Sequence, residues 1–197
     1  MSIFKTEITS DIIPSDNPIH QRLLKPYIII KDQIKGKVLE LGCGEGRGIE
    51  EVMSKADTFL GLDKIDEVIR KLQEKYPEAE FKQAVFPPLS FLDKDSFDYI
   101  ISFQVIEHIK YDRLYLEEIY RVLRPGGIAV VTTPNVKLSL SRNPWHIREY
   151  TARELLDLTS SIFDKVDAKG ISGNDRVMQY HKENKRSVDR IMRFDVL

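Results

Sequence analysis

The sequence predicts a doubly wound α/β fold with a mostly parallel sheet, and three observations support this. Apolar, strand-like segments alternate with amphipathic helical segments along most of the 197 residues. Closely spaced glycines at residues 42–48 directly follow an apolar strand, as at the ligand-binding edge of such sheets. A second strand ends in an acid, Asp63, about 20 residues beyond that loop. A chain of this length with 42% hydrophobic residues can bury one full core.

Caps, breakers and a period of 3.6 residues indicate the helices. Asn17 and Pro18 have the pattern of an N-cap and a first helical position, and the helix that they open should bend at Pro26. Thr151 and Glu154 form a capping box that opens another helix. The helices between them are expected at 49–55, 65–75 and 111–124, the last ending where Arg-Pro-Gly-Gly interrupts it.

Short apolar or β-branched runs indicate the strands. They are expected at 38–41, 59–63, 79–84, 97–102, 128–133 and 163–171. The sequence after residue 171 is polar, basic and helical in period, so either a seventh strand is absent or the chain is truncated, which the apolar end favours. We expect a helical cap at 1–36, a core at 37–173 with a lid loop at 134–150, and a basic helical segment at 174–197.

Composition narrows the choice of partners and compartment. Thirty basic and thirty-one acidic residues give a net charge of -1, which argues against nucleic-acid binding. The single cysteine, Cys43, forms no internal disulfide and is expected to be a small packing residue. No apolar run reaches the roughly 20 residues of a membrane span, and the N-terminus lacks a signal-peptide pattern. We expect a cytoplasmic protein without stable membrane insertion, although the basic C-terminal segment could associate weakly with a surface.

The glycine loop distinguishes between cofactors. A dinucleotide fingerprint requires a third glycine where this chain has Arg47 or Ile49. The motif here is Glu-x-Gly-x-Gly-x-Gly, and it begins at Glu40. A carboxylate at the strand tip would repel a diphosphate but would attract a cationic amino-acid group, such as S-adenosylmethionine (SAM) carries.

The chain resembles the class I SAM-dependent methyltransferases, in the broad subgroup with small-molecule and quinone O-methyltransferases. The resemblance covers residues 38–133 and rests on the order and spacing of motifs at 40–46, 63, 97–102, 105–109 and 121–127. It implies a Rossmann-like fold, SAM as the cofactor, and methyl transfer to a small-molecule acceptor, with oxygen as the expected methylated atom.

The resemblance also implies which residues would hold the cofactor. The glycine loop would lie under the amino-acid end of SAM, and Asp63 with Lys64 would meet the ribose, unless Asp63 only caps the next helix. Adenine would lie beside the end of the third strand, where this chain lacks the acid of many family members. The expected cofactor-binding residues are Glu40, Gly42, Cys43, Gly44, Gly46, Asp63, Lys64, Ala84, Val85, Phe103 and Gln104.

Two histidines are candidates for the base that an oxygen nucleophile needs. His108 follows the fourth strand, where open α/β sheets bind their ligands, although it could equally anchor the loop with Glu107. His146 lies in the expected lid, among aromatic and polar residues suited to substrate contact. Some relatives carry Glu-x-x-Glu-His at the first of these sites, but Gln104 replaces one carboxylate here, so no metal site is expected.

Two rival functions stay open at this point. A non-catalytic SAM-binding protein fits the same motifs, whereas a nicotinamide-dependent oxidoreductase conflicts with Glu40 and Arg47. The sequence identifies neither the acceptor nor the oligomeric state.

Overall fold

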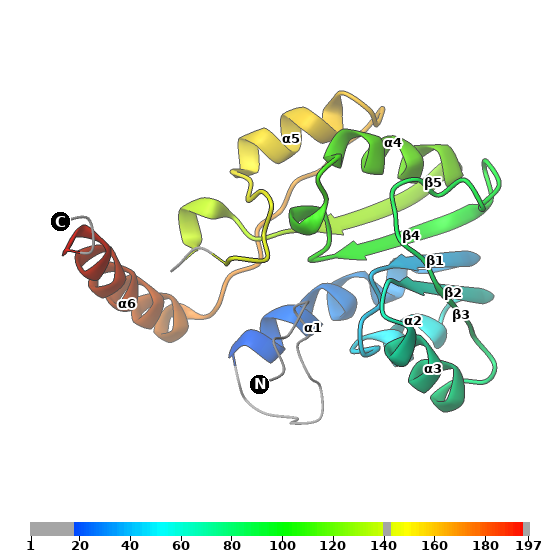
Figure 1. Cartoon of the computed structure of the whole chain (residues 1–197), viewed down its shortest axis with the longest axis horizontal. Helices are drawn as coiled ribbons and strands as arrows, with labels where there is room; N and C mark the ends of the chain where they lie inside the picture. Colours follow the sequence, from blue (N-terminus) through cyan, green and yellow to red (C-terminus); the bar gives the residue numbers. More distant parts are fainter. Residues whose placement is uncertain (1–17, 140–142, 195–197) are drawn as a thin grey trace.

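A five-stranded parallel sheet forms the centre of the computed structural model (Figure 1). The structure describes residues 18–139 and 143–194, with side chains for 21–139 and 143–185. The strands are β1 (Lys37–Leu41), β2 (Thr58–Asp63), β3 (Glu80–Gln83), β4 (Phe97–Phe103) and β5 (Leu123–Thr132). Their order is β3-β2-β1-β4-β5, and every neighbouring pair is parallel. The predicted doubly wound sheet is confirmed.

The order of the strands determines where a ligand can bind. The chain moves outward from β1 through β2 to β3, then crosses back to place β4 on the other side of β1. In such sheets the crevice lies at the carboxyl ends of the two strands on either side of this reversal. Leu41 pairs with Ser102 there, so the glycine loop after β1 and the segment after β4 are neighbours.

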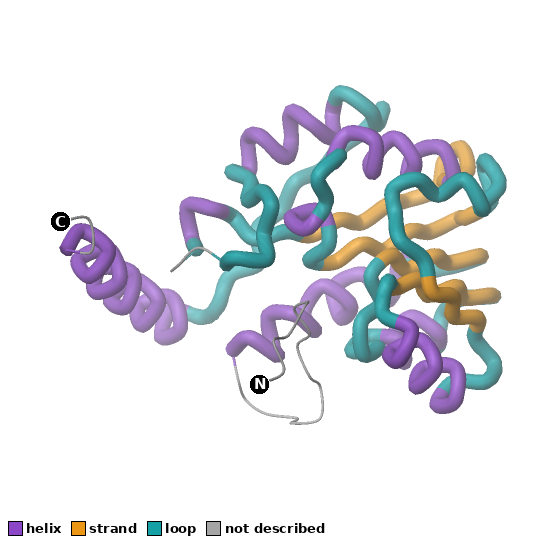
Figure 2. The backbone as a smooth tube through the Cα atoms, in the orientation of Figure 1, coloured by secondary structure: helices purple, strands orange, loops and turns teal. Residues whose placement is uncertain are grey.

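Helices cover both faces of the sheet, as Figure 2 shows. One face carries α1 (Pro18–Ile30), α2 (Ile49–Met53) and α3 (Asp66–Lys75), and the other carries α4 (Asp112–Val122) and α5 (Ala152–Ser160). Short 3-10 helices are η1 (Lys31–Gln33), η2 (Ile106–His108) and η3 (Val136–Leu138). The last helix, α6 (Asp175–Phe194), extends away from the sheet (Figure 1).

Alternation along the central strands produces two cores. Val38 and Tyr99 point to the side of α1 and α3, whereas Leu39 and Ile100 point to the side of α4. All four side chains are almost fully buried. The strands are apolar on both faces because both faces are covered, as is usual for parallel sheets.

Most of the predicted elements are present, with ends shifted by a few residues. Pro26 lies inside α1, whereas the expected N-cap, Asn17, falls outside the described residues. The prediction of a sixth strand at 163–171 is wrong, because that segment is irregular and largely exposed. Its apolar residues do not alternate strictly, and Gly170 with several charged residues interrupts them.

The start of β5 is also corrected. We expected a helix to residue 124 and a strand from 128, but α4 ends at Val122 and β5 begins at Leu123. Leu123 pairs with Phe97, and pairing resumes between Ile128 and Tyr99 after a shift of register. The Pro-Gly-Gly segment therefore forms an irregularity within a strand instead of a separate turn.

The C-terminal part of the chain is helical. In place of a seventh strand, the described residues contain α6, so that expectation agrees with the structure as far as residue 194. Beyond residue 185 its side chains lie outside the described part, so weak surface association through this segment stays a prediction. Across the described helices, none combines the length and apolar character needed to cross a membrane.

Candidate functional site

The glycine loop turns sharply at the end of β1. Gly42, Gly44 and Gly46 all have positive φ, at 75°, 50° and 82°, a region that favours glycine. The backbone N–H groups of Gly42 and Cys43 donate to the Leu62 carbonyl at 2.7 and 3.1 Å, which fastens the loop to β2. A Cβ atom on Gly42 would lie 2.5 Å from Val105, whereas one on Gly44 would meet nothing within 4 Å. The loop is thus packed against Val105 at Gly42, whereas at Gly44 it faces open space.

Glu40 is a buried carboxyl group at the tip of this strand. Its side chain is 1% exposed, and Tyr27 of α1 donates a hydrogen bond of 2.5 Å to Glu40 Oε1. Among the residues that the structure describes, Glu40 Oε2 has no hydrogen-bond partner. Burial raises the pKa of Glu40 to about 7, the hydrogen bond from Tyr27 opposes that shift, and the charge of Asp63 adds to it. A cation that reached Oε2 would compensate this buried group.

Asp63 joins the glycine loop to the next helix. Its Oδ2 accepts from the Gly44 N–H and its Oδ1 from the Ile65 N–H, both at 3.0 Å. Ile65 is the N-cap of α3, and Asp63, two residues earlier, accepts from the N–H of that N-cap residue and not from one in the first turn, so Asp63 is not the cap of this helix. Each oxygen of Asp63 can accept a further hydrogen bond, because a carboxylate can accept about four.

The third strand ends beside Asp63. The Ala84 N–H donates to the Asp63 carbonyl at 2.8 Å, and Ala84 is half-buried. Val85 is 77% exposed, which presents an apolar surface at this edge. Lys64 is exposed, and its carbonyl oxygen accepts a hydrogen bond from Gln83. The residues expected around the ribose and adenine thus lie at adjacent strand ends.

The end of β4 carries an unusual backbone conformation. Phe103 packs edge-on against the Tyr27 ring, with centroids 4.7 Å apart. Gln104 has a φ of 57°, which is uncommon for a residue with a side chain. Its side chain donates to Thr132 Oγ1 and its N–H to the Thr132 carbonyl, and these bonds hold the strained residue in place. Strain of this kind is concentrated at functional sites.

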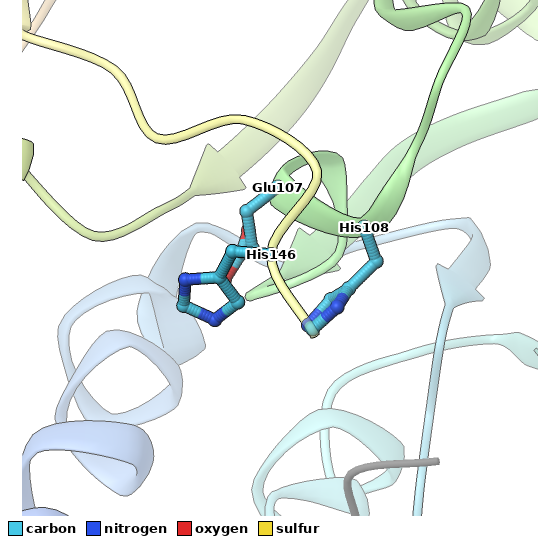
Figure 3. Close-up of side chains that lie close together, drawn as sticks. All are labelled: Glu107, His108 and His146. Atoms are coloured by element: carbon cyan, nitrogen blue, oxygen red, sulfur yellow. The ribbon is translucent and has the colours of Figure 1, made fainter. Parts of the chain in front are cut away.

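Three potential ligand or base groups gather just beyond this point (Figure 3). Glu107 and His108 belong to η2, and His146 comes from the loop before α5. One side-chain ligand atom from each of the three lies within 4.8 Å of the others. The two imidazole rings are 5.0 Å apart and nearly perpendicular. The structure therefore brings together the two histidines that the sequence suggested separately.

Hydrogen bonds orient both imidazoles. His108 Nδ1 lies 2.9 Å from the Trp145 carbonyl oxygen, and His146 Nδ1 lies 2.7 Å from Glu149 Oε1. Burial raises the pKa of Glu149, but hydrogen bonds from Ser139 and His146 outweigh it and hold that pKa below the ordinary value. Glu149 is therefore an ionised acceptor, and each histidine uses Nδ1 as its donor.

Comparisons with known proteins identify the fold and the cofactor class. A model of the methyltransferase domain matches residues 39–131. A Mycolicibacterium smegmatis protein named "Probable S-adenosylmethionine-dependent methyltransferase" is 36% identical over 140 residues, which are 68% of this chain and 54% of that protein. The chain belongs to the class I SAM-dependent methyltransferase family.

A solved structure agrees with this fold. The SAM-dependent methyltransferase of Mesorhizobium loti has a TM-score of 0.67 and covers 86% of this chain and 93% of its own, at 17% identity. Two more distant relatives have names that point to different acceptors. A ubiquinone biosynthesis O-methyltransferase of Pelagibacter ubique is 27% identical over 62% of this chain and 55% of its own length. An mRNA cap guanine-N(7) methyltransferase of Cryptococcus neoformans is 28% identical over 72% of this chain and 26% of its own.

The chain spans about half the length of the curated relatives that it matches first. The matched domain contains the glycine loop, Asp63 and η2, whereas His146 lies beyond it. Two features of the matched domain fit the amino-acid end of SAM. One is the buried Glu40 oxygen that lacks a partner, and the other is the open space above Gly44.

Sequence reasoning missed two residues of this methyltransferase site. Tyr27 is not among the site residues expected from the sequence, but its hydroxyl contacts Glu40, and a Cβ atom on Gly48 would clash with its ring. Glu149 was not singled out, although its spacing of three residues from His146 in the lid was a usable signal. Arg148 of the same loop is paired with Asp112 at 2.8 Å.

Proposed function

We propose that this protein transfers the methyl group of SAM to a hydroxyl oxygen of a small molecule. The observation that carries the proposal is the position of the Glu107, His108 and His146 group. It lies just beyond the strand end of β4, next to the glycine loop, so a proton acceptor is available beside the expected cofactor. The name of the Pelagibacter ubique relative supports oxygen as the methylated atom.

The cofactor is held by the strand ends of β1 to β4. Glu40 accepts the ammonium group of the amino-acid end, and the loop at 42–46 lies beneath it. The two oxygens of Asp63 accept from the ribose hydroxyls, with Lys64 alongside. Adenine is flanked by Ala84 and Val85, and by Phe103 and Gln104 on the side of β4. The open space above Gly44 and the exposure of Val85 support this placement.

The chemistry requires little from the protein beyond positioning. When bound, SAM supplies a methyl carbon on a sulfonium, and the oxygen–carbon bond forms as the carbon–sulfur bond breaks, its electron pair staying on sulfur. The acceptor hydroxyl loses its proton in the process. Alignment of the two reactants and exclusion of water supply most of the acceleration.

The histidines take the proton of the acceptor. Because Nδ1 of each ring is already a donor, Nε2 carries the lone pair that can accept a proton. On His146 that proton would take the place of the hydrogen bond from the Asn143 side chain. The ionised Glu149 stabilises positive charge on His146, as a carboxylate does in a histidine–acid pair. His108 also anchors the loop, because its Nδ1 contacts the Trp145 carbonyl.

The segments around the core have supporting roles in this proposal. The α1 helix covers the glycine loop through Tyr27, which supports its role as a cap. The loop at 134–150 acts as a lid, although residues 140–142 lie outside the described part. Trp145 and Ile147 are 41% and 58% exposed and offer apolar surface to an acceptor.

Binding and turnover test different parts of the proposal. Calorimetry with SAM and with NADH should show binding of SAM alone, and binding of NADH alone would overturn the assignment. Radiolabelled SAM incubated with metabolite extracts should label a small molecule that partitions with hydroxyl-bearing compounds. His108→Ala and His146→Ala should each slow that transfer, whereas His181→Ala on α6 should not. Unchanged turnover in the first two variants would remove both base candidates.

A nucleic-acid acceptor is the competing substrate class, because one relative is named as an mRNA cap methyltransferase. The net charge of -1 does not favour a nucleic-acid surface. Methyl incorporation into total RNA, compared with incorporation into metabolites, separates the two classes. Label confined to RNA would replace the small-molecule acceptor and leave the methyltransferase assignment intact.

A further inference from the structure

The group formed by Glu107, His108 and His146 has the composition of a metal site. Its ligand atoms lie within 4.8 Å of one another and comprise one carboxylate oxygen and two imidazole nitrogens. Two histidines and one glutamate form a known ligand set of catalytic zinc sites, in which a further position stays open for water or substrate. We propose that these three residues bind a divalent transition-metal ion, with Zn²⁺ as the first candidate.

The orientation of the imidazoles supports this proposal. A carbonyl oxygen only accepts hydrogen bonds, so the 2.9 Å contact with the Trp145 carbonyl puts the hydrogen of His108 on Nδ1. His146 donates from Nδ1 to the ionised Glu149 at 2.7 Å. Histidines that bind metals almost always donate their other ring N–H to a carboxylate or a carbonyl. Both histidines here have one of these two partners.

A third contact identifies the lone pair on His146 independently. The side-chain amide nitrogen of Asn143 lies 3.0 Å from His146 Nε2, and Asn143 Oδ1 accepts from the Trp145 N–H. An amide nitrogen donates, so Nε2 of His146 accepts. A bound ion would take the place of that amide hydrogen and leave the rest of the loop bonded as it is.

The hydrogen bonds of Glu107 also suit a metal ligand. Glu107 is 1% exposed, and Thr133 Oγ1 donates to its Oε2 at 3.0 Å, which orients the carboxylate. The Glu107 carbonyl accepts from the N–H groups of Ile147 and Arg148 at 2.8 and 3.2 Å. These bonds tie η2 to the loop that carries His146.

The rearrangement required is small. Bonds of about 2.0–2.2 Å to zinc place tetrahedral ligand atoms roughly 3.4 Å apart. The ligand atoms here lie within 4.8 Å of one another, so no pair must approach by more than about 1.4 Å. Rotation of the His108 and His146 side chains can close that gap. Gln104 replaces a carboxylate that some relatives carry, and this replacement argued against a metal site. Its side chain is bonded to Thr132 and is not part of this ligand set. His146 supplies the third ligand from another part of the chain.

This site deepens the proposed function and rests on it for its catalytic role. A hydroxyl that approaches the open position of the ion would have its pKa lowered, as happens for water on zinc. The acceptor would then release its proton to solvent before its oxygen attacks the methyl carbon. In that case the histidines act as ligands, and their Nδ1 partners keep them in position.

The first test measures the metal alone. The full chain, treated with chelator and dialysed, is titrated with ZnCl₂ by calorimetry without SAM or acceptor, and bound zinc is counted by mass spectrometry. We expect one ion per chain. A residue that hydrogen-bonds a metal ligand contributes roughly 10–100-fold to metal affinity. His108→Ala and His146→Ala should each weaken zinc binding by more than this, whereas Glu149→Gln should weaken it by an amount within this range. His181→Ala, an exposed histidine bonded to the Leu138 carbonyl, should leave binding unchanged.

Other measurements keep the proposal testable if a variant fails to fold. The visible spectrum of the wild-type chain with Co²⁺ should show a site of low coordination number, and circular dichroism without metal shows whether each variant is folded. No stoichiometric binding by the wild-type chain, or binding that both histidine variants retain, would overturn the site. Methyl transfer that resists chelators, without zinc binding, overturns the site and leaves the proposed function intact. Zinc binding without methyl transfer would support the site and overturn the proposed function.

Discussion

At the scale of single residues, the pair of Tyr27 and Glu40 is central to the account. A carboxyl group that is 1% exposed with a pKa of about 7 is held partly protonated near neutrality. One of its oxygens has a hydrogen bond from Tyr27 and the other lacks a partner. If position 40 served only packing, an apolar side chain there would make the fold more stable. We therefore interpret Glu40 as a group kept for a cation.

The Glu40 carboxyl predicts a pH dependence of stability. Its pKa is raised from 4.5 to about 7 in the folded chain, so between these values the native state holds a proton that the unfolded state has lost. Stability should fall as pH rises through this window, by on the order of 3 kcal/mol at most, and should level off above it.

Urea unfolding of the wild type and of Glu40→Gln between pH 4.5 and 8 measures this effect. The variant should lack most of the slope. Tyr27→Phe should extend the decline to higher pH, because the hydrogen bond from Tyr27 favours the ionised carboxylate and its loss raises the pKa of Glu40 further. Equal slopes in the wild type and Glu40→Gln would show that Glu40 is not the titrating group.

Two glycines make a matched pair at the same scale. Gly44 and Gly126 both have positive φ, and a Cβ atom on either would meet nothing within 4 Å. Gly44→Ala and Gly126→Ala should each cost on the order of 1 kcal/mol through backbone strain alone. SAM affinity, measured by calorimetry, should fall only in Gly44→Ala, because its methyl group enters the space assigned to the cofactor. Equal SAM affinities in the two variants would contradict that assignment.

At the scale of elements, the start of α5 shows a local signal that was sufficient. Thr151 accepts from the Glu154 N–H at 3.2 Å, and Glu154 accepts from the Thr151 N–H at 2.8 Å, as the sequence predicted. Thr151→Ala should destabilise the fold by about 1 kcal/mol, and Thr151→Ser should retain most of that energy. Thermal unfolding checks both, and an unchanged midpoint in Thr151→Ala would show that this cap does not limit stability.

Elements without a strong local signal were predicted less well. The segment at 163–171 has apolar residues but is irregular and largely exposed, so its composition alone suggested a strand that does not form. The start of β5 depends on pairing with Phe97, which lies elsewhere in the chain. Local patterns therefore predicted the helix caps and the buried strands, whereas edges set by tertiary pairing were placed incorrectly.

At the scale of the whole molecule, the strand order brings the site together. The expected cofactor residues follow four different strands, and the reversal between β1 and β4 places these ends along one edge. Motif spacing could predict that gathering, because carboxyl ends of parallel strands meet at one edge. The contacts of Tyr27 with Glu40 and of His146 with Glu149 depend on how α1 and the lid dock. No pattern within a single segment encodes such docking.

The central claim is that Glu40 receives a cationic amino-acid group, and proton release on binding tests it most directly. Calorimetry with S-adenosylhomocysteine at pH 6, in two buffers of different ionisation enthalpy, counts the protons that leave the complex. Because Glu40 has a pKa of about 7 without ligand, a bound ammonium group should expel close to one proton from the wild-type chain. None should leave Glu40→Gln. Equal proton counts in the two proteins would contradict the account.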